Sequence, residues 1–260
     1  KSRTFSLASL LLPKERAEAI FRLYYVCRTL DDWADEGHGE KLREARQCWS
    51  EHRPHELLDH YRFLQARWGL DSLPLNDLMD AMLREQEGVR IKSEEELLEY
   101  CHGVAGTIGL MTCPIFGVTE PDALQHADDL GIAMQLTNIC RDVREDAEND
   151  RIYLPADFFT TSPSVSDLLS KDSKWIEETV LVKRRLLSLA EERYASGEAG
   201  IRYLPFRMRI VVSWAGRMYR EIGELIRDDP TGYHSERAVV KSGKKLRILL
   251  PSLGRAFLSR

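Results

Sequence analysis

Hydrophobic residues recur at helical spacing along almost the whole chain. Apolar positions three or four residues apart predict helices over residues 14–36, 40–52, 55–68, 75–89, 94–116, 122–148, 175–196, 205–227 and 235–257. The connections between these helices are short, and no segment alternates apolar and polar residues as a half-buried strand does. We therefore expect an all-α fold in which residues 1–260 form a single domain and helices pack on helices.

The predicted helix over residues 94–116 carries a stripe of small residues. Gly103, Gly106 and Gly109 lie on it, and each glycine costs a helix interior up to about 1 kcal/mol relative to alanine. Two explanations can offset this cost: the glycines permit close packing against a neighbouring helix, or they form the smooth wall of an apolar channel.

Two pairs of aspartates stand out inside otherwise apolar helices. Asp31 and Asp35 are four residues apart, as are Asp142 and Asp146, so each pair projects two carboxylates from one helix face. Like charges at this spacing repel one another by a few tenths of a kcal/mol, unless a cation lies between them. Arg28 precedes the first pair by about one turn. Sparse oxygen ligands of this kind suit Mg²⁺, which completes its shell with water and substrate phosphates. The pattern indicates an enzyme that acts on diphosphates.

The second pair belongs to a longer polar stripe. Gln135, Asn138, Asp142 and Asp146 follow one another at intervals of three, four and four residues, and the amide of Asn138 offers a further oxygen ligand. The alternative is a solvent-facing acidic stripe balanced by neighbouring arginines such as Arg141. That alternative explains poorly why two acidic stripes occur on two otherwise apolar helices.

Composition places the chain among ordinary globular proteins. Hydrophobic residues make up 43% and charged residues 30%, and no apolar run reaches the roughly 18 residues of a membrane-spanning helix. The formal charge of −5 argues against nucleic acid as the main partner, because phosphate backbones are bound by basic surfaces. Five cysteines without close pairing indicate reduced, packed thiols in a cytoplasmic protein.

Three segments carry a family resemblance. Residues 24–35 read YYVCRTLDDWAD, residues 100–109 read YCHGVAGTIG, and residues 135–146 read QLTNICRDVRED, followed by RIYLP at 151–155. These segments resemble the squalene/phytoene synthase family, and the third with its RIYLP tail is the most specific of them. Residues 2–5 and 237–246 are similar to the family as well. The resemblance therefore covers nearly the whole chain, in the family's order.

The resemblance implies a fold and a reaction. The family's fold is a helical isoprenoid-synthase bundle with a central apolar cavity, and its two acidic motifs face each other across the mouth. The implied enzyme is a Mg²⁺-dependent prenyltransferase of carotenoid or other isoprenoid biosynthesis. It condenses two isoprenyl diphosphates head to head through a cyclopropylcarbinyl diphosphate intermediate. Two or three Mg²⁺ ions, for which Mn²⁺ can substitute, are expected on Asp31, Asp35, Asn138, Asp142 and Asp146.

The resemblance also assigns roles to further residues. It places at the reaction centre Asp31, Asp35, Asp142, Asp146, Tyr24 and Arg28. It assigns diphosphate binding to Arg28, Arg141, Arg237 and Lys245, and to a segment near the start of the chain that includes Ser2, Thr4 and Phe5. Other substrate-binding positions are Tyr100, Val104, Gln135, Asn138, Tyr153 and Tyr219. A packed core role is the alternative for the tyrosines at 24, 153 and 219.

Residues 80–90 match the family less well. Relatives often carry another acidic pattern on this helix, which Gln86, Gly88 and Arg90 interrupt here. We therefore expect no additional role for the helix.

The expected product is phytoene from two geranylgeranyl diphosphates, or squalene or dehydrosqualene from two farnesyl diphosphates. Ser9 is small where a bulky residue would shorten the pocket, which favours the forty-carbon product. The alternatives are a related class I terpene synthase that acts on a single diphosphate, and a non-catalytic lipid-binding paralogue. The latter has no use for clustered carboxylates. The absence of a Gly-x-Gly-x-x-Gly motif after a strand excludes a Rossmann site. Binding of NADPH at a site of another kind is a remaining alternative, but we expect no reductant.

The last twenty residues alternate basic and apolar side chains. Such a tail can rest on anionic lipid, which would give peripheral membrane contact, or it can pack its apolar face on the core, which is the favoured alternative. Failure of the protein to co-sediment with anionic vesicles would count against the membrane contact.

Overall fold

The computed structural model describes residues 12–86, 88–229, 231 and 238. The regular secondary structure among these residues is helical with no β-strand, and one isolated backbone bridge joins Arg90 to Ile152. The longer helices are α2 (Lys14–Asp35), α3 (Gly39–Ser50), α4 (Glu56–Trp68), α5 (Leu73–Glu85), α6 (Glu94–Cys101), α7 (Thr107–Phe116), α8 (Pro121–Glu148), α10 (Ser173–Gly200) and α11 (Phe206–Asp228). Short elements are the π-helical turn η1 (His102–Gly106), η2 (Ala156–Phe158), α9 (Val165–Leu169) and η3 (Ile201–Tyr203).

The eight helices predicted between residues 14 and 227 are all present. The predicted helix over residues 94–116 is one run of α6, η1 and α7, in which a π-helical turn replaces α-helical geometry at His102–Gly106. The predicted end of α5 was wrong, since the helix stops at Glu85 and Gly88 has a φ of +90°, outside helical geometry. Apart from residue 238, the predicted helix over residues 235–257 lies outside the described residues. Helix α9 was not predicted.

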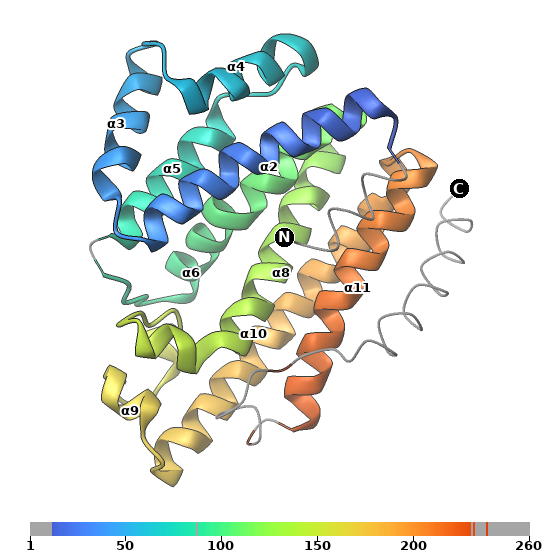
Figure 1. The fold of residues 1–260 in the computed structure, drawn as a ribbon. Coiled ribbons are helices and arrows are strands. Elements are labelled where there is room, and N and C mark those ends of the chain that lie inside the picture. The colour runs from blue at the N-terminus through green and yellow to red at the C-terminus, as the bar shows by residue number, and fades with distance from the viewer. Residues whose placement is uncertain (1–11, 87, 230, 232–237, 239–260) are drawn as a thin grey trace.

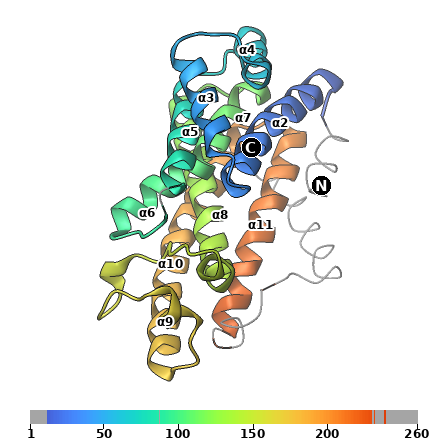
Figure 2. The same cartoon turned by 60° about the vertical axis from the view of Figure 1, so that its left-hand side comes forward.

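Helix α8 is the centre of the bundle. It packs along α10 and also contacts α7, η1 and α11. In both views α2 to α5 gather at one end of the molecule, while α9 and the start of α10 lie at the other end (Figures 1 and 2). One apolar core cluster joins α2 to α5 and α7, and a second surrounds the middle of α8 and α10. The acidic motifs lie in the last third of α2 and the last third of α8, so the packing of these helices positions them.

Glycines bring α8 close to the π-turn and to α7. A Cβ atom on Gly109 would lie 2.5 Å from the carbonyl oxygen of Ala127, and one on Gly131 would lie 2.5 Å from that of Ala105. Both contacts are with backbone, so a larger residue would force the helices apart. Gly109 and Gly131 also line the apolar cavity described below. The two explanations of the small-residue stripe are therefore both correct.

The cysteines are free thiols, as predicted. Cys48, Cys101, Cys113 and Cys140 are buried, and burial raises the pKa of the partly buried Cys27 thiol to about 12. Within the described part of the chain, no helix is both long enough and apolar enough to cross a membrane.

Candidate active site

The two aspartate pairs line one pocket. Asp31 and Asp35 from α2 and Asp142 and Asp146 from α8 border a cavity of about 220 Å³, which we call the acidic pocket. The other described residues that line the acidic pocket come from α5, α6, η1, α8 and the segment after α8. Each helix places its pair on one face because the two carboxylates are separated by one turn.

A larger cavity of about 400 Å³ adjoins the acidic pocket and is lined mainly by apolar side chains of α2, η1, α7, α8 and α11. We call it the apolar cavity. Val104, Gln135 and Asn138 line both spaces, so they mark the place where the two meet. A ligand with a charged head and a long hydrocarbon tail fits this combination, because its head would meet polar groups while its tail is removed from water.

Burial and mutual repulsion perturb the acidic pairs. Burial, followed by the neighbouring Asp35 carboxylate, raises the pKa of Asp31 to about 6. Burial, followed by the Asp142 carboxylate, raises the pKa of Asp146 to about 7. Both shifts mean that the ionised form is disfavoured without a compensating cation. A divalent cation held between such carboxylates would remove that penalty.

The residues of the acidic pocket fit a hard divalent cation. The Oδ1 atom of Asn138 is buried without a hydrogen-bond partner, while its Nδ2 atom donates to Gln135 at 3.2 Å. An unpaired amide oxygen beside carboxylates is a ligand that Mg²⁺ accepts. Among the described residues, no three His, Cys, Asp or Glu side chains converge into a ready-made cage. Sparse protein ligation suits Mg²⁺, which retains waters and takes oxygens from substrate phosphates.

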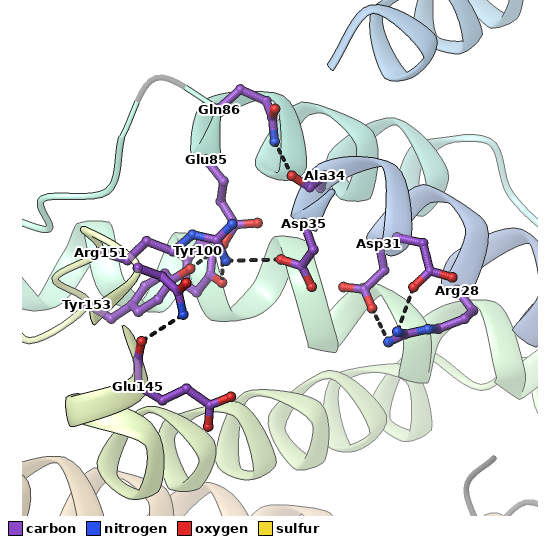
Figure 3. A network of polar contacts seen from close by, with 12 residues as sticks. Arg28, Asp31, Ala34, Asp35, Glu85, Gln86, Tyr100, Glu145, Arg151 and Tyr153 are labelled. Atoms are coloured by element: carbon purple, nitrogen blue, oxygen red, sulfur yellow. Dashed lines mark hydrogen bonds and ion pairs between the residues drawn. The ribbon is translucent and has the colours of Figure 1, made fainter. Parts of the chain in front are cut away.

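Two of the predicted diphosphate-binding arginines contact the motif carboxylates. Arg28 donates to Asp31 at 2.6 Å and pairs with Asp32 at 2.6 Å (Figure 3). Arg141 donates from Nε to Asp142 at 2.8 Å and makes a second, very short contact with the same carboxylate. Neither arginine is among the described residues that line the acidic pocket or the apolar cavity. In this structure both hold carboxylates in place.

Arg151 joins the two motifs and was not singled out as a site residue from the sequence. It follows α8, lines the acidic pocket, and donates from Nη1 to the Oδ1 atom of Asp35 at 3.0 Å, as Figure 3 shows. A cation in this position offsets part of the negative charge of the pocket. A sequence signal was available, because Arg151 begins the RIYLP segment that carries the resemblance.

Glu85 is a second site residue that the sequence did not reveal. Its Oε1 atom accepts hydrogen bonds from the hydroxyls of Tyr100 at 2.6 Å and Tyr153 at 2.5 Å (Figure 3). The two tyrosine rings stack with centroids 4.8 Å apart, and burial together with Glu85 raises the pKa of Tyr100 well above its usual value. All three residues line the acidic pocket. Helix α5 therefore supplies one carboxylate to the acidic pocket, which the expectation for residues 80–90 did not include.

The remaining predicted site residues divide between the two spaces. Tyr24 and Tyr219 line the apolar cavity, whereas Tyr100 and Tyr153 line the acidic pocket. Val104 and Gln135 lie at the junction. The other predicted substrate-binding residues lie outside the described part of the chain, namely Ser2, Thr4, Phe5, Arg237 and Lys245.

Sequence comparison connects this geometry with known proteins. The sequence model of the family described as squalene/phytoene synthase matches residues 1–244. The chain is 31% identical to the 15-cis-phytoene synthase of Enterobacter agglomerans, in an alignment covering 100% of this chain and 93% of that protein. It is 33% identical to the 15-cis-phytoene synthase of Synechococcus elongatus, covering 98% and 89%. The chain spans 64% of the chloroplastic phytoene synthase of Narcissus pseudonarcissus, to which it is 32% identical.

Structural comparison gives the same fold. A crystal structure of a dehydrosqualene synthase in complex with ligand superimposes with a TM-score of 0.82 at 24% sequence identity, covering 99% of this chain and 92% of that one. A squalene synthase from Alicyclobacillus acidocaldarius superimposes with a TM-score of 0.74 at 21% identity, covering 86% and 88%. At these identities the structural similarity concerns the fold.

Proposed function

Because the chain belongs to the squalene/phytoene synthase family, and is thus a prenyltransferase that condenses isoprenyl diphosphates head to head, we propose that it converts two geranylgeranyl diphosphates to phytoene. The observation that carries the proposal is the junction at Val104, Gln135 and Asn138, where an acidic pocket meets an apolar cavity. The choice of the twenty-carbon substrate is supported by the sequence relatives named phytoene synthase, which align along nearly the whole chain.

We propose that Asp31, Asp35, Asn138, Asp142 and Asp146 hold two or three Mg²⁺ ions, or Mn²⁺ in their place. When bound, the ions would neutralise the diphosphates and stabilise the charge that develops as a diphosphate leaves. The five oxygen-bearing side chains would bring the two diphosphates to one place, since without cations their carboxylates repel a diphosphate. The unpaired Oδ1 atom of Asn138 supports its inclusion.

The other residues of the site would orient the substrate and exclude water. The apolar cavity would enclose the tails, so that the allylic cation left after departure of a diphosphate meets hydrocarbon walls. Glu85 holds the hydroxyls of Tyr100 and Tyr153 beside the acidic pocket. We propose that Glu85 acts as a positioning residue for these two phenols, which limit the space around the departing diphosphate.

The proposed reaction balances without a reductant. The first half joins two allylic chains into a cyclopropylcarbinyl diphosphate and releases one diphosphate and one proton. In the second half the remaining diphosphate leaves, the carbon skeleton rearranges, and loss of a second proton forms the central double bond of phytoene. We therefore propose no NADPH requirement.

The proposal predicts the product of a simple incubation. Purified protein with Mg²⁺ and geranylgeranyl diphosphate should yield phytoene, identified by liquid chromatography and mass spectrometry, and farnesyl diphosphate alone should be the poorer substrate. A thirty-carbon product from farnesyl diphosphate in preference to phytoene would contradict the chain length. Release of a cyclised or unrearranged monomer from either substrate would contradict head-to-head chemistry.

We propose that the reaction takes place in the cytoplasm, with peripheral membrane contact through the basic tail as the less favoured alternative. The tail at residues 241–260, which motivates the contact, lies outside the described residues. The co-sedimentation test given above applies to it.

A further inference from the structure

His102 lies at the start of a π-helical turn that carries two parts of the site. The turn η1 runs from His102 to Gly106, and the N–H of Thr107 donates to the carbonyl oxygen of His102, five residues earlier. Tyr100, two residues before His102, lines the acidic pocket, and Val104, two residues after it, lies at the junction with the apolar cavity. The geometry of this turn therefore decides where both side chains meet a bound substrate.

The imidazole of His102 faces a carboxylate on each of two neighbouring helices. Its Nδ1 atom lies 2.7 Å from the Oδ1 atom of Asp128 on α8, and its Nε2 atom lies 3.7 Å from the Oδ2 atom of Asp77 on α5. An ionised carboxylate accepts but cannot donate, so Nδ1 carries a proton. At 3.7 Å the Nε2 atom makes no hydrogen bond, and it attracts Asp77 only as part of an imidazolium. Neutral His102 therefore binds α8 alone, whereas charged His102 joins α8 to α5.

The contact between His102 and Asp128 depends on the shape of the turn. A Cβ atom on Gly106 would overlap the Oδ1 atom of Asp128, so this carboxylate occupies the space that the glycine leaves open. The side chain of Asp128 is only 15% exposed and that of His102 is 35% exposed, so the pair differs from a fully solvated surface ion pair. The turn and α8 are therefore fitted to one another at this contact.

The contact between His102 and Asp77 acts on the helix that also fixes Tyr100. Asp77 lies in the first half of α5, and Glu85, the last residue of α5, accepts a hydrogen bond from the hydroxyl of Tyr100 at 2.6 Å (Figure 3). Helix α5 thus contacts the continuous run of α6 and η1 at two places eight residues apart. A change in the attraction between His102 and Asp77 would therefore be transmitted to the position of Tyr100.

We infer that His102 is a positioning residue for the proposed reaction: as an imidazolium it bridges Asp128 and Asp77, and so holds Tyr100 and Val104 where the substrate binds. The inference rests on the proposed function, because it adds a charge-dependent control to the same site. His102 itself is not among the described residues that line either cavity. It acts on the site through the turn and through α5.

The surroundings of His102 favour its charged form. The hydrogen bond to Asp128 raises the pKa of the imidazole above its ordinary value of 6.5, burial opposes this change, and the charges of Asp128 and Asp77 raise the pKa further. Among the described residues, α6 and α7 at the two ends of the turn add no charge that acts on this pKa. Because the folded protein has the higher pKa, the bridge is complete at a pH below the ordinary value. It is lost as the pH rises through the folded value.

His102→Asn tests the bridge, because the asparagine amide can still donate to Asp128 but cannot become charged. At about pH 6 we expect kcat to be about 3- to 10-fold below that of the unmodified protein. The ratio of the two kcat values should approach about 1 as the pH rises through the pKa of His102, which NMR measures directly. Asp77→Asn should give the same pH dependence, and the double variant should be no slower than either single variant. The titrations of Asp31 and Asp146 are common to all the proteins compared.

A control variant and a second readout separate this role from a general loss of structure. His52→Asn, at an exposed position with a φ of 57° that asparagine accepts, should leave the pH profile unchanged. Thermal unfolding checks the fold of each variant. In the metal-free protein, the NMR signals of the Tyr100 ring should shift as His102 titrates, and this shift should be reduced in Asp77→Asn. That readout does not require turnover.

The inference fails on any of three results. These are a kcat ratio that stays constant from about pH 6 to about pH 9, a pKa of His102 at or below its ordinary value, and effects of the His102 and Asp77 substitutions that add to one another. If the unmodified protein makes no head-to-head product while the Tyr100 signals still follow the charge of His102, the proposed function fails and the coupling of His102 to the site stands.

Discussion

Replacing Asp142 by alanine is expected to reduce turnover by about 10²- to 10³-fold while the helical fold is retained. Asp142 lines the acidic pocket opposite the α2 pair, and its loss would remove a cation ligand where the leaving diphosphate develops charge. The measurement is steady-state product formation at saturating Mg²⁺, with the far-ultraviolet circular dichroism spectrum as the check on folding. Asp157→Ala, at an exposed position outside both cavities, should behave like the unmodified protein.

Asp142→Asn separates loss of charge from loss of structure. The asparagine oxygen can still accept from Arg141, which would otherwise remain largely buried beside an alanine. Because the Asp142 charge helps to raise the pKa of Asp146 to about 7, the Asn variant should show a lower pKa for Asp146 in an NMR titration of the metal-free protein. Wild-type kcat/KM in the Asn variant, at subsaturating Mg²⁺, would contradict a role for this carboxylate in cation binding.

Replacing Glu85 by alanine should lower both stability and turnover. Two largely buried phenol hydroxyls donate to this carboxylate, and without it they lose their acceptor. The expected decrease in the free energy of unfolding is about 2 to 4 kcal/mol, because each unsatisfied hydroxyl costs about 1 to 2 kcal/mol. We expect kcat to fall about 10²-fold, since the tyrosines would no longer keep their positions beside the diphosphate site. Chemical denaturation and initial-rate kinetics measure the two effects.

Glu85→Gln is the matched variant for this prediction. The amide oxygen of glutamine can accept from Tyr100 and Tyr153 but carries no charge. Recovery of both stability and most of kcat in Glu85→Gln would identify Glu85 as a positioning residue. A stable Gln variant as inactive as Glu85→Ala would show that the negative charge itself is required, and would contradict the positioning role.

Local sequence patterns predicted the helices well where their end signals are strong. The predicted range 122–148 differs from α8 (Pro121–Glu148) by one residue, because the proline itself takes the first helical position and the apolar spacing continues to the helix end. The predicted end of α5 failed because Val89 follows Met82 at the seven-residue helical interval, although the chain has left helical geometry by Gly88. Apolar periodicity alone does not detect the end of a helix when the next apolar residue falls at a helical interval.

The candidate site could be predicted only in part, because some of its contacts join residues far apart in the chain. Spacing alone places Asp31 with Asp35, and Asp142 with Asp146, because residues four apart share a helix face. Spacing does not show that the two pairs border one pocket, because this depends on how α2 and α8 pack. The family resemblance supplied that expectation. Glu85 contacts tyrosines 15 and 68 residues away in the chain, so no local pattern reveals it. Such contacts arise only when distant helices assemble.

A crystal structure with Mg²⁺ and a non-hydrolysable thio-diphosphate analogue of geranylgeranyl diphosphate is the most direct test that the two acidic motifs act together. We predict Mg²⁺ ions on the carboxylates of both α2 and α8, with the diphosphate in contact with these ions and the tail in the apolar cavity. A diphosphate bound away from the acidic pocket, or ions on only one motif in the presence of the analogue, would contradict it.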